Sequence, residues 1–354
     1  MKLFRCLRCG LLALCLLLPA ACGSSSAPDG GSANVTLKVF NWGDYIDPEV
    51  TELFTQETGI EVIYTMFEAN EDMYTSIKAS GGVSHDVVIP SDYMIRKMIN
   101  EDMLRKINLD NVPNYSLLDD RFKDLDFDPQ NEYSVPYMWG TVGIAYNTTM
   151  VNGPIDSWTA LWDEQYRKNI FMMDSVRDSL GVTLKMLGYS MNTKNEAELQ
   201  EAYDKLVAQK PLVLAYTGDE VKDKMIAGEA ALAVVYAGDA ITISDENPDI
   251  AYVIPREGSN LWVDSMCILK TAQNPEAAEA FINFMCSTPI AQRNWAYINY
   301  SSPQQEVIAQ MPEEFRNNPA RNPSAEELAR CEVFEDLSQT TQYYEDLWTR
   351  LIGA

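Results

Sequence analysis

A single histidine, His85, is present among the 354 residues of this chain. Histidine is the most common general base at neutral pH, and hydrolytic nucleophiles generally depend on such a base. The sequence also lacks the Gly-x-Ser-x-Gly elbow of serine hydrolases and the His-Glu-x-x-His motif of zinc peptidases. His85 stands directly before an apolar segment, which favours a capping or surface residue. We therefore do not expect an enzyme, and a hydrolase is kept as the alternative from another functional class.

Basic residues are also scarce. The chain has 27 Lys and Arg residues against 52 Asp and Glu residues, which gives a formal net charge of −25 at pH 7. This balance argues against nucleic acid and anionic membrane surfaces as partners. A field of this sign attracts cations, but an acidic surface can also serve only to keep a protein soluble. An apolar content of 46% is ordinary for a globular protein, and the length suffices for one large core or two lobes.

The cysteines do not predict a disulfide framework. Four of the seven lie within the first 22 residues. The other three, Cys267, Cys286 and Cys331, are widely spaced and odd in number. Cys267 and Cys286 lie in apolar runs, which predicts that they pack as small core residues.

The N-terminal segment has the features of a secretion signal. Its basic start precedes an apolar run at residues 11–18 that is too short to span a bilayer. Small residues then precede Cys22, as in bacterial lipoprotein signals, although Pro19 departs from the Leu that is usual at its position. We interpret residues 1–21 as a lipoprotein signal peptide, Cys22 as the lipidated residue, and the Gly- and Ser-rich residues 22–33 as a flexible tether.

Strand and helix patterns alternate along the rest of the chain, which predicts an α/β fold with a mostly parallel sheet. After residue 275 only helices are predicted, at residues 275–286, 289–298, 326–330 and 335–351. Two longer β-rich runs, at residues 133–146 and 261–269, are long enough to leave one lobe and enter another. The shorter predicted strands lie at residues 35–40, 61–66, 86–90, 170–173, 212–216, 231–236 and 250–254.

The stretch after the first predicted strand combines Trp42, Asp44 and Tyr45. It precedes a predicted helix, with Asp47 as its N-cap and Pro48 at the first helical position. Open α/β sheets bind ligands at the carboxyl ends of their strands. An aromatic face beside a carboxylate suits an organic ammonium group. Taken alone, an ordinary turn with a core Trp explains the stretch equally well.

Similar side chains recur at later strand ends and on the second β-rich run. Each member has a structural explanation of its own, such as helix capping for Ser91 and Asp92, a first-turn charge for Asp178 or core packing for Trp262. Their recurrence at equivalent places in the topology favours a ligand site. The recurring residues are Ser91, Asp92, Tyr93, Asp178, Tyr236, Asp239, Trp262, Asp264 and Tyr300.

A calcium loop is not expected. Asp124, Asp126 and Asp128 imitate the start of an EF-hand loop. The sixth position is Pro129, where the turn requires Gly, and the twelfth is Val135, where a bidentate Glu is required. We interpret this stretch as a solvated acidic loop and expect no metal site in the chain.

Several longer motifs resemble those of the spermidine/putrescine-binding proteins of bacterial ABC importers. The resemblance runs from about residue 36 to the C-terminus and implies a two-lobe, type II periplasmic-binding-protein-like fold whose two β crossovers form the hinge. The motifs are Phe-Asn-Trp-Gly-Asp-Tyr (40–45), Gln-Glu-Thr-Gly-Ile (56–60), Ile-Pro-Ser-Asp-Tyr (89–93), Phe-Asp-Pro-Gln-Asn-Glu-Tyr-Ser-Val-Pro-Tyr-Met-Trp-Gly (127–140), Leu-Gly-Tyr-Ser (187–190), Trp-Val-Asp-Ser (262–265) and Tyr-Tyr-Glu-Asp-Leu (343–347).

The resemblance also implies domain boundaries. Lobe 1 would comprise residues 34–138 together with about 266–300. Lobe 2 would comprise residues 139–265, with the C-terminal helices at about 301–354 packing on it.

The resemblance implies a site in which aromatic rings surround the methylene chain of a polyamine and carboxylates hold its amines. Ser91 and Tyr93 would lie at one end, and Asp92 is placed in the same ligand-binding set. Tyr236 stands where Trp is expected, Gly43 replaces a hydroxyl residue, and Ser175 replaces an acid of spermidine-type members. The implied aromatic residues are Trp42, Tyr45, Tyr236, Trp262 and Tyr300, and the implied carboxylates are Asp44, Asp178, Asp239 and Asp264.

The expected partners follow from the same resemblance. They are a polyamine ligand and a cognate ABC permease in the cytoplasmic membrane, with membrane attachment through lipid on Cys22. We expect a monomer without a cofactor, located on the outer face of the cytoplasmic membrane, which is the periplasmic space in a Gram-negative cell. The alternative ligands for a protein of this kind are a sugar, thiamine or iron.

Overall fold

The first strand and the first helix form where the local sequence predicts them. In this computed structural model, β1 (Thr36–Trp42) leads into α1 (Pro48–Thr58). The Asp47 carboxylate accepts a first-turn N–H at 2.9 Å, and Pro48 begins the helix. The helix ends at Gly59, whose φ of 75° is left-handed and suits glycine. The predicted N-cap is confirmed.

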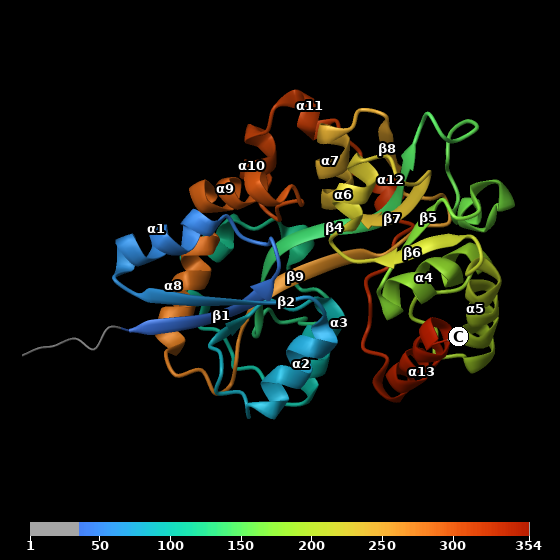
Figure 1. The fold of residues 1–354 in the computed structure, drawn as a ribbon. Coiled ribbons are helices and arrows are strands. Elements are labelled where there is room, and N and C mark those ends of the chain that lie inside the picture. The colour runs from blue at the N-terminus through green and yellow to red at the C-terminus, as the bar shows by residue number, and fades with distance from the viewer. Residues whose placement is uncertain (1–34, 354) are drawn as a thin grey trace, which may run out of the picture. The chain divides into compact units, whose positions relative to one another are not determined.

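The structure describes residues 35–353, and within them nine strands form one sheet (Figure 1). The strands after β1 are β2 (Glu61–Phe67), β3 (Val87–Val88), β4 (Ser134–Asn147), β5 (Ile170–Met173), β6 (Val213–Thr217), β7 (Leu232–Tyr236), β8 (Ile250–Val253) and β9 (Leu261–Ile268). Their order is β2-β1-β3-β9-β4-β7-β5-β6, and β8 also pairs with β4. Strands β2 and β3 are parallel to β1, and β6 and β7 are parallel to β5.

The two long β-rich runs lie at the centre of this sheet. Strands β4 and β9 pair with each other antiparallel, and each also pairs antiparallel with a neighbour, β7 for β4 and β3 for β9. They therefore join the parallel group around β1 to the parallel group around β5. The prediction of two α/β lobes linked by β crossovers is confirmed.

Helices cover both groups of strands. They are α2 (Asn70–Ala79), α3 (Asp92–Asn100), α4 (Val176–Leu187), α5 (Glu196–Gln209), α6 (Val221–Ile226), α7 (Ala237–Glu246), α8 (Pro275–Met285), α9 (Thr288–Ile298), α10 (Gln305–Gln310), α11 (Glu313–Arg316), α12 (Ala325–Leu328) and α13 (Thr341–Gly353). In Figure 1, α13 lies with α4 and α5, which it contacts. Helix α10 instead packs on α9, so the C-terminal helices divide between two places in the fold. The domain boundaries stay a prediction.

The sequence patterns were least informative for the short helical elements. Helices α10 and α11 span only 6 and 4 residues and were not predicted, because so short a segment shows no helical period. Several 3-10 turns were missed for the same reason. They lie at Leu109–Asn111, Pro113–Leu117, Asp120–Phe122, Trp158–Trp162, Glu164–Tyr166 and Ser338–Thr340.

The interpretation of Asp128 as part of a solvated acidic loop is wrong. Its carboxylate is buried and accepts the backbone N–H groups of Tyr133 and Ser134, each at 2.9 Å. These bonds fasten the loop to the start of β4. Asp124 and Asp126 are exposed, as the interpretation expects.

The remaining cysteines are free, and Cys267 and Cys286 are buried in the apolar core as predicted. None of the helices in residues 35–353 has the length and apolar character needed to cross a membrane. The predicted signal peptide, the tether and Cys22 lie outside the described residues.

Candidate ligand-binding site

Four of the predicted aromatic side chains form a continuous row of edge-to-face contacts. The ring centroids of Tyr45 and Tyr300 are 5.6 Å apart, those of Tyr300 and Trp262 are 5.1 Å apart, and those of Trp262 and Tyr236 are 6.0 Å apart. Tyr45 follows β1, Tyr300 follows α9, Trp262 lies on β9 and Tyr236 ends β7. Residues from four distant segments thus line one apolar surface. Trp42 lies against Phe67 instead, at a centroid distance of 4.6 Å.

Two glycines make room for this row. Gly140 lies opposite Trp262 in the pairing of β4 with β9, and a Cβ on it would approach the indole ring to 2.6 Å. A Cβ on Gly238 would approach the ring of Tyr300 to 2.1 Å. Any larger residue at either position would displace the ring, so glycine is required for the close approach.

Three of the predicted aspartates each accept a hydrogen bond from a tyrosine of the row. Tyr45 Oη donates to Asp264 Oδ2 at 2.8 Å. Tyr300 Oη donates to Asp239 Oδ1 at 3.1 Å, and Tyr236 Oη donates to Asp178 Oδ2 at 3.1 Å. The exposed fractions of Asp178, Asp239 and Asp264 are 4%, 8% and 5%. The aromatic surface is therefore bordered by buried carboxylates that the same rings help to orient.

Asp264 has an unused acceptor. Its Oδ1 atom is buried and accepts no hydrogen bond from the described residues. Burial raises the pKa of this carboxyl to about 6, although the Tyr45 hydrogen bond and the nearby Ser91 hydroxyl act in the opposite direction. Trp262 lies two residues earlier on β9, so both side chains point to the same face of the strand. A buried acceptor without a partner is costly unless a ligand supplies the donor.

Asp239 shares its surroundings with a cation that was not predicted. Lys222 Nζ lies 3.9 Å from Asp239 Oδ1 and 3.9 Å from Asp44 Oδ2. Burial raises the pKa of Asp239 to about 6, Lys222 lowers it, and nearby Asp219 raises it. Asp44 itself is exposed and has a left-handed φ of 48°. The structure brings Asp44 and Asp239 together around one lysine.

Asp178 accepts more side-chain hydrogen bonds than the other two aspartates. Ser175 donates to it at 2.7 Å, and Asn260 Nδ2 lies 3.5 Å from its other oxygen. Burial raises its pKa, while the hydrogen bonds from Ser175, Tyr236 and Asn260 lower it. Ser175, which replaces an acid of spermidine-type members, caps α4 and orients Asp178 here.

The Ser91-Asp92-Tyr93 segment divides into two kinds of residue. Asn70 Nδ2 lies 3.1 Å from both Ser91 Oγ and Tyr93 Oη, which ties these side chains to α2. Asn70 is the first residue of α2. Asp92 is fully buried and accepts the N–H groups of Tyr93 at 2.7 Å and Val263 at 3.1 Å. These contacts assign Asp92 to fastening α3 against β9.

Sequence analysis missed Asn70, Lys222, Asp219 and Asn260. Asp219 follows β6, so the strand-end rule that found the other acids could have found it. The same rule could not have found Lys222, because it selected only acidic and aromatic residues and Lys222 is basic. Asn70 and Asn260 matter only through partners distant in sequence.

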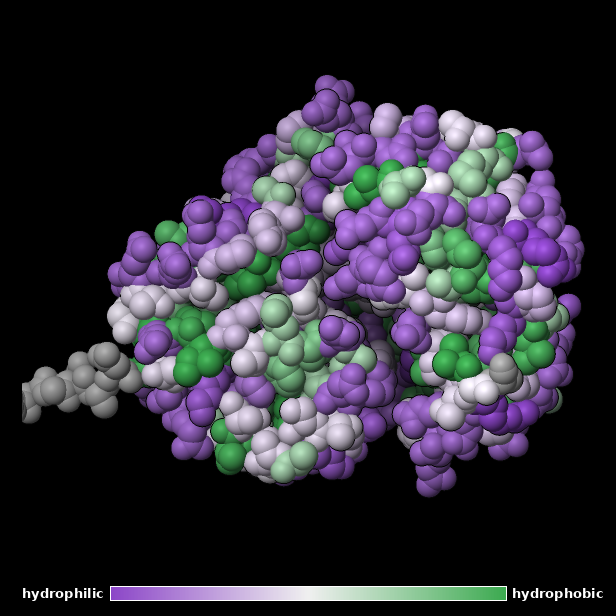
Figure 2. Space-filling model, viewed as in Figure 1, coloured by the Kyte–Doolittle hydropathy of each residue, from purple (hydrophilic) through white to green (hydrophobic). Residues whose placement is uncertain are grey.

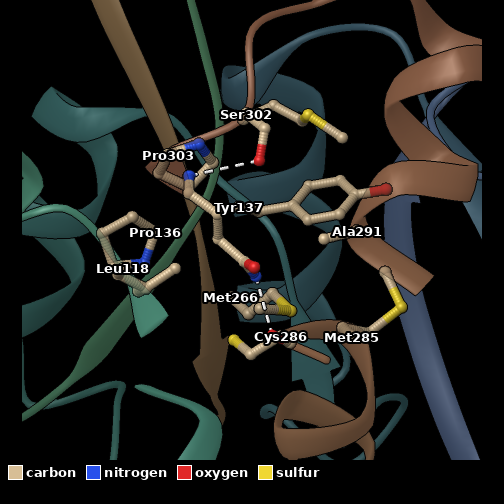
Figure 3. A pocket seen from close by; sticks show the side chains of 11 residues that line it. Leu118, Pro136, Tyr137, Met266, Met285, Cys286, Ala291, Ser302 and Pro303 are labelled. Carbon is tan, nitrogen blue, oxygen red and sulfur yellow. Dashed lines mark hydrogen bonds between the residues drawn. The ribbon is translucent and has the colours of Figure 1, made fainter. Parts of the chain in front are cut away.

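The molecular surface is hollowed between α3 and α4, whose first turns carry Tyr93 and Asp178 (Figure 2). A separate small pocket is lined by other residues (Figure 3). Its Tyr137 donates a hydrogen bond to the backbone oxygen of Tyr45 at 2.7 Å. No carboxylate lines that pocket, so it does not suit a cation. Its lining residues are Leu118, Pro136, Tyr137, Met138, Met266, Met285, Cys286, Ala291, Ser302, Pro303 and Gln304.

Metal-ligating side chains do not gather among residues 35–353, where no three of His, Cys, Asp or Glu could hold an ion together. The single histidine has local partners. Its ring stacks on Phe40 at 4.2 Å, and its nitrogens lie 2.9 Å from the hydroxyls of Thr65 and Ser84. Burial lowers the pKa of His85.

Comparison with known proteins places these features in context. A family model described as bacterial extracellular solute-binding protein matches residues 49–323. The chain is 34% identical to the spermidine/putrescine-binding periplasmic protein of Salmonella typhimurium, over 94% of this chain and 95% of that protein. It is also 34% identical to the protein of the same name from Escherichia coli, over 90% of this chain and 92% of that protein.

Solved structures give a similar result. A protein of Listeria monocytogenes described as a spermidine/putrescine ABC transporter is 43% identical, with a TM-score of 0.86 over 90% of this chain and 98% of that one. The spermidine/putrescine ABC transporter substrate-binding protein of Streptococcus pneumoniae is 41% identical, with a TM-score of 0.79 over 90% of this chain and 99% of that one.

Proposed function

Because the chain belongs to the bacterial extracellular solute-binding proteins, we propose that it captures polyamines outside the cytoplasm and delivers them to an ABC importer. The ligand is spermidine, putrescine or both, as the names of the relatives suggest. The observation that carries the proposal is the buried Oδ1 atom of Asp264, which has no donor among the described residues and belongs to a carboxylate bonded to Tyr45 of the aromatic row.

The chemistry of a polyamine matches this arrangement. At neutral pH it is a flexible alkane with two or more ammonium groups. Burial of an unpaired ammonium is prohibitive, so each charged group requires a carboxylate. Asp264 supplies an unused acceptor for one ammonium, and Asp178 and Asp239 lie along the same row. Tyr45, Tyr300, Trp262 and Tyr236 would present ring faces and edges to the methylene chain. Ser91 pairs with Asp264 in an antiparallel bridge, whereas the Tyr93 ring lies beside Arg177, the neighbour of Asp178.

The expected contact free energies are sufficient for micromolar affinity. Desolvation of a methylene contributes roughly 0.8 kcal/mol. An ammonium over an aromatic face adds roughly 0.5–2 kcal/mol. After the costs of association, several such terms reach the ~8 kcal/mol that corresponds to micromolar binding. No covalent chemistry is needed.

The alternatives fit the site less well. Iron would require clustered tyrosines and histidines, and His85 is engaged with Thr65 and Ser84. A sugar favours amides and hydroxyls over three buried carboxylates. Catalysis by His85 would require a buried acid to orient it, whereas Thr65 occupies its Nε2. We therefore propose a binding protein without catalytic activity.

The remaining proposals concern the surroundings of the protein. Lipid on Cys22 would hold it at the outer face of the cytoplasmic membrane, which is the periplasmic space in a Gram-negative cell. The tether over residues 22–33 would let a monomer reach a cognate permease. These features rest on the sequence pattern and on the family.

Calorimetric titration of the full chain in detergent would test the proposed function. Putrescine and spermidine should bind in the micromolar range or tighter, whereas maltose, thiamine and ferric citrate should give no binding heat. Binding of one of the latter ligands without a response to either polyamine would contradict the proposal.

A further inference from the structure

Lys222 places a resident ammonium group inside the candidate site. It lies in the first turn of α6, and its side chain is only 22% exposed. Its Nζ atom is 3.9 Å from Asp44 Oδ2, after β1, and 3.9 Å from Asp239 Oδ1, in the first turn of α7. One lysine therefore bridges carboxylates that belong to the two different groups of strands.

The contacts of Lys222 with the two carboxylates are electrostatic. A distance of 3.9 Å exceeds the 2.7–3.2 Å typical of N–H···O hydrogen bonds, so neither carboxylate holds it by a direct bond. Asp239 accepts Tyr300 Oη instead, and the Asp44 side chain is 76% exposed. A third acid, Asp219, lies close enough to raise the pKa of Asp239. The lysine thus occupies the centre of an acidic group, at about the place that a ligand ammonium would take.

The order of the residues along the aromatic row shows which carboxylates remain for ligand ammonium groups. Tyr45, with Asp264, lies at one end of the row, and Tyr236, with Asp178, lies at the other. Asp239 lies beside Tyr300, next to the Tyr45 end. Two ligand ammonium groups can therefore pair with Asp264 and Asp178 while Lys222 stays in place. A third ammonium would require the Asp239 position, which Lys222 already neutralises.

We propose that Lys222 is a specificity-determining residue, which favours diamines over triamines by acting as the site's own third ammonium. This inference rests on the proposed polyamine function and names the ligand subclass for the same site. A lysine that only formed an ion pair at the rim of the site would change the affinity for all cationic ligands equally. A resident third ammonium affects a triamine much more than a diamine.

The test compares putrescine and spermidine on Lys222→Met and on a matched control. Methionine keeps the apolar stem of the lysine and removes its charge. The control is Lys224→Met on the same helix, where the lysine contacts Glu229 at 3.7 Å and Phe171. Titrations would be made on the full chain at pH 8, because removal of Lys222 takes away an influence that keeps the Asp239 pKa down.

In Lys222→Met, the affinity ratio of spermidine to putrescine should rise at least tenfold over the unaltered protein. Lys224→Met and the charge-conserving Lys222→Arg should leave the ratio within about twofold. An unchanged ratio in Lys222→Met, or equal gains for both ligands, would overturn the proposal. If Lys222→Met is poorly folded, Lys222→Gln gives the same comparison. Failure of the unaltered protein to bind either polyamine would instead refute the proposed function itself.

Discussion

Replacement of Asp264 by Asn should separate ligand binding from stability. The change keeps the shape of the side chain and an acceptor for Tyr45 Oη, which now bonds the carboxylate at 2.8 Å. It removes the charge that we assign to a ligand ammonium. Loss of one partner from a buried ion pair costs on the order of 3–5 kcal/mol. Polyamine affinity should therefore fall a few-hundred-fold or more.

The ligand-free protein should respond in the opposite direction. Burial raises the pKa of Asp264 from 3.8 to about 6, so the folded state holds a proton that the unfolded state releases between these pH values. A rise in pH through this window lowers the free energy of unfolding, and the cost is fully present above pH 6. A shift of two pKa units corresponds to about 3 kcal/mol. Asp264→Asn removes this cost, so the variant should be up to about 3 kcal/mol more stable at pH 7 and no more stable below pH 4.

The two responses would be measured by calorimetric titration and by denaturant unfolding of ligand-free protein at several pH values. Asp126→Asn is the control, because Asp126 is exposed and solvated charges contribute only about 0–1 kcal/mol. Wild-type affinity in Asp264→Asn would show that this aspartate is only a structural residue of β9. Equal losses in both variants would show that the attraction is diffuse. A variant that loses both affinity and stability at pH 7 would refute the reasoning about the buried charge.

Three further predictions concern closure, pH and the anchor. A chain that begins at Asn34 should show a smaller radius of gyration by small-angle scattering when putrescine is added, since the ligand favours the state in which it touches both lobes; an unchanged profile at saturation argues against closure. Polyamine affinity should fall about tenfold per participating carboxyl between pH 7 and pH 5, because the pKa values of Asp239 and Asp264 are both about 6; calorimetry with a flat profile over this range would contradict their role. Cys22→Ala should release the protein from the membrane fraction or block its processing, and a variant that stays membrane-bound at normal size on an immunoblot would exclude the lipid anchor.

The sequence by itself determined the longer strands and helices and their order. The N-cap Asp47, the helix stop at Gly59 and the lengths of β4 and β9 depend on residues that are neighbours in the chain. Hydrophobic periods and caps act over a few residues, so they can be recognised without the fold. The same local rules placed aromatic and acidic residues at strand ends.

Only the tertiary structure decided which of these residues act together. Asp92 and Asp264 look alike in the sequence, yet the carboxylate of Asp92 is used up by the N–H groups of Tyr93 and Val263, while Asp264 keeps a buried oxygen without a partner. Their contacts depend on how α3 packs against β9, which involves residues far apart in the chain.

The position of Lys222 was likewise decided by the fold. Its approach to Asp44 and Asp239 requires β1, α6 and α7 to meet, and no local pattern encodes that meeting. The raised pKa values have the same origin, because burial by the whole structure removes water from each carboxyl. Local sequence thus determined which chemical groups are available, and long-range packing decided which of them carry an unsatisfied charge.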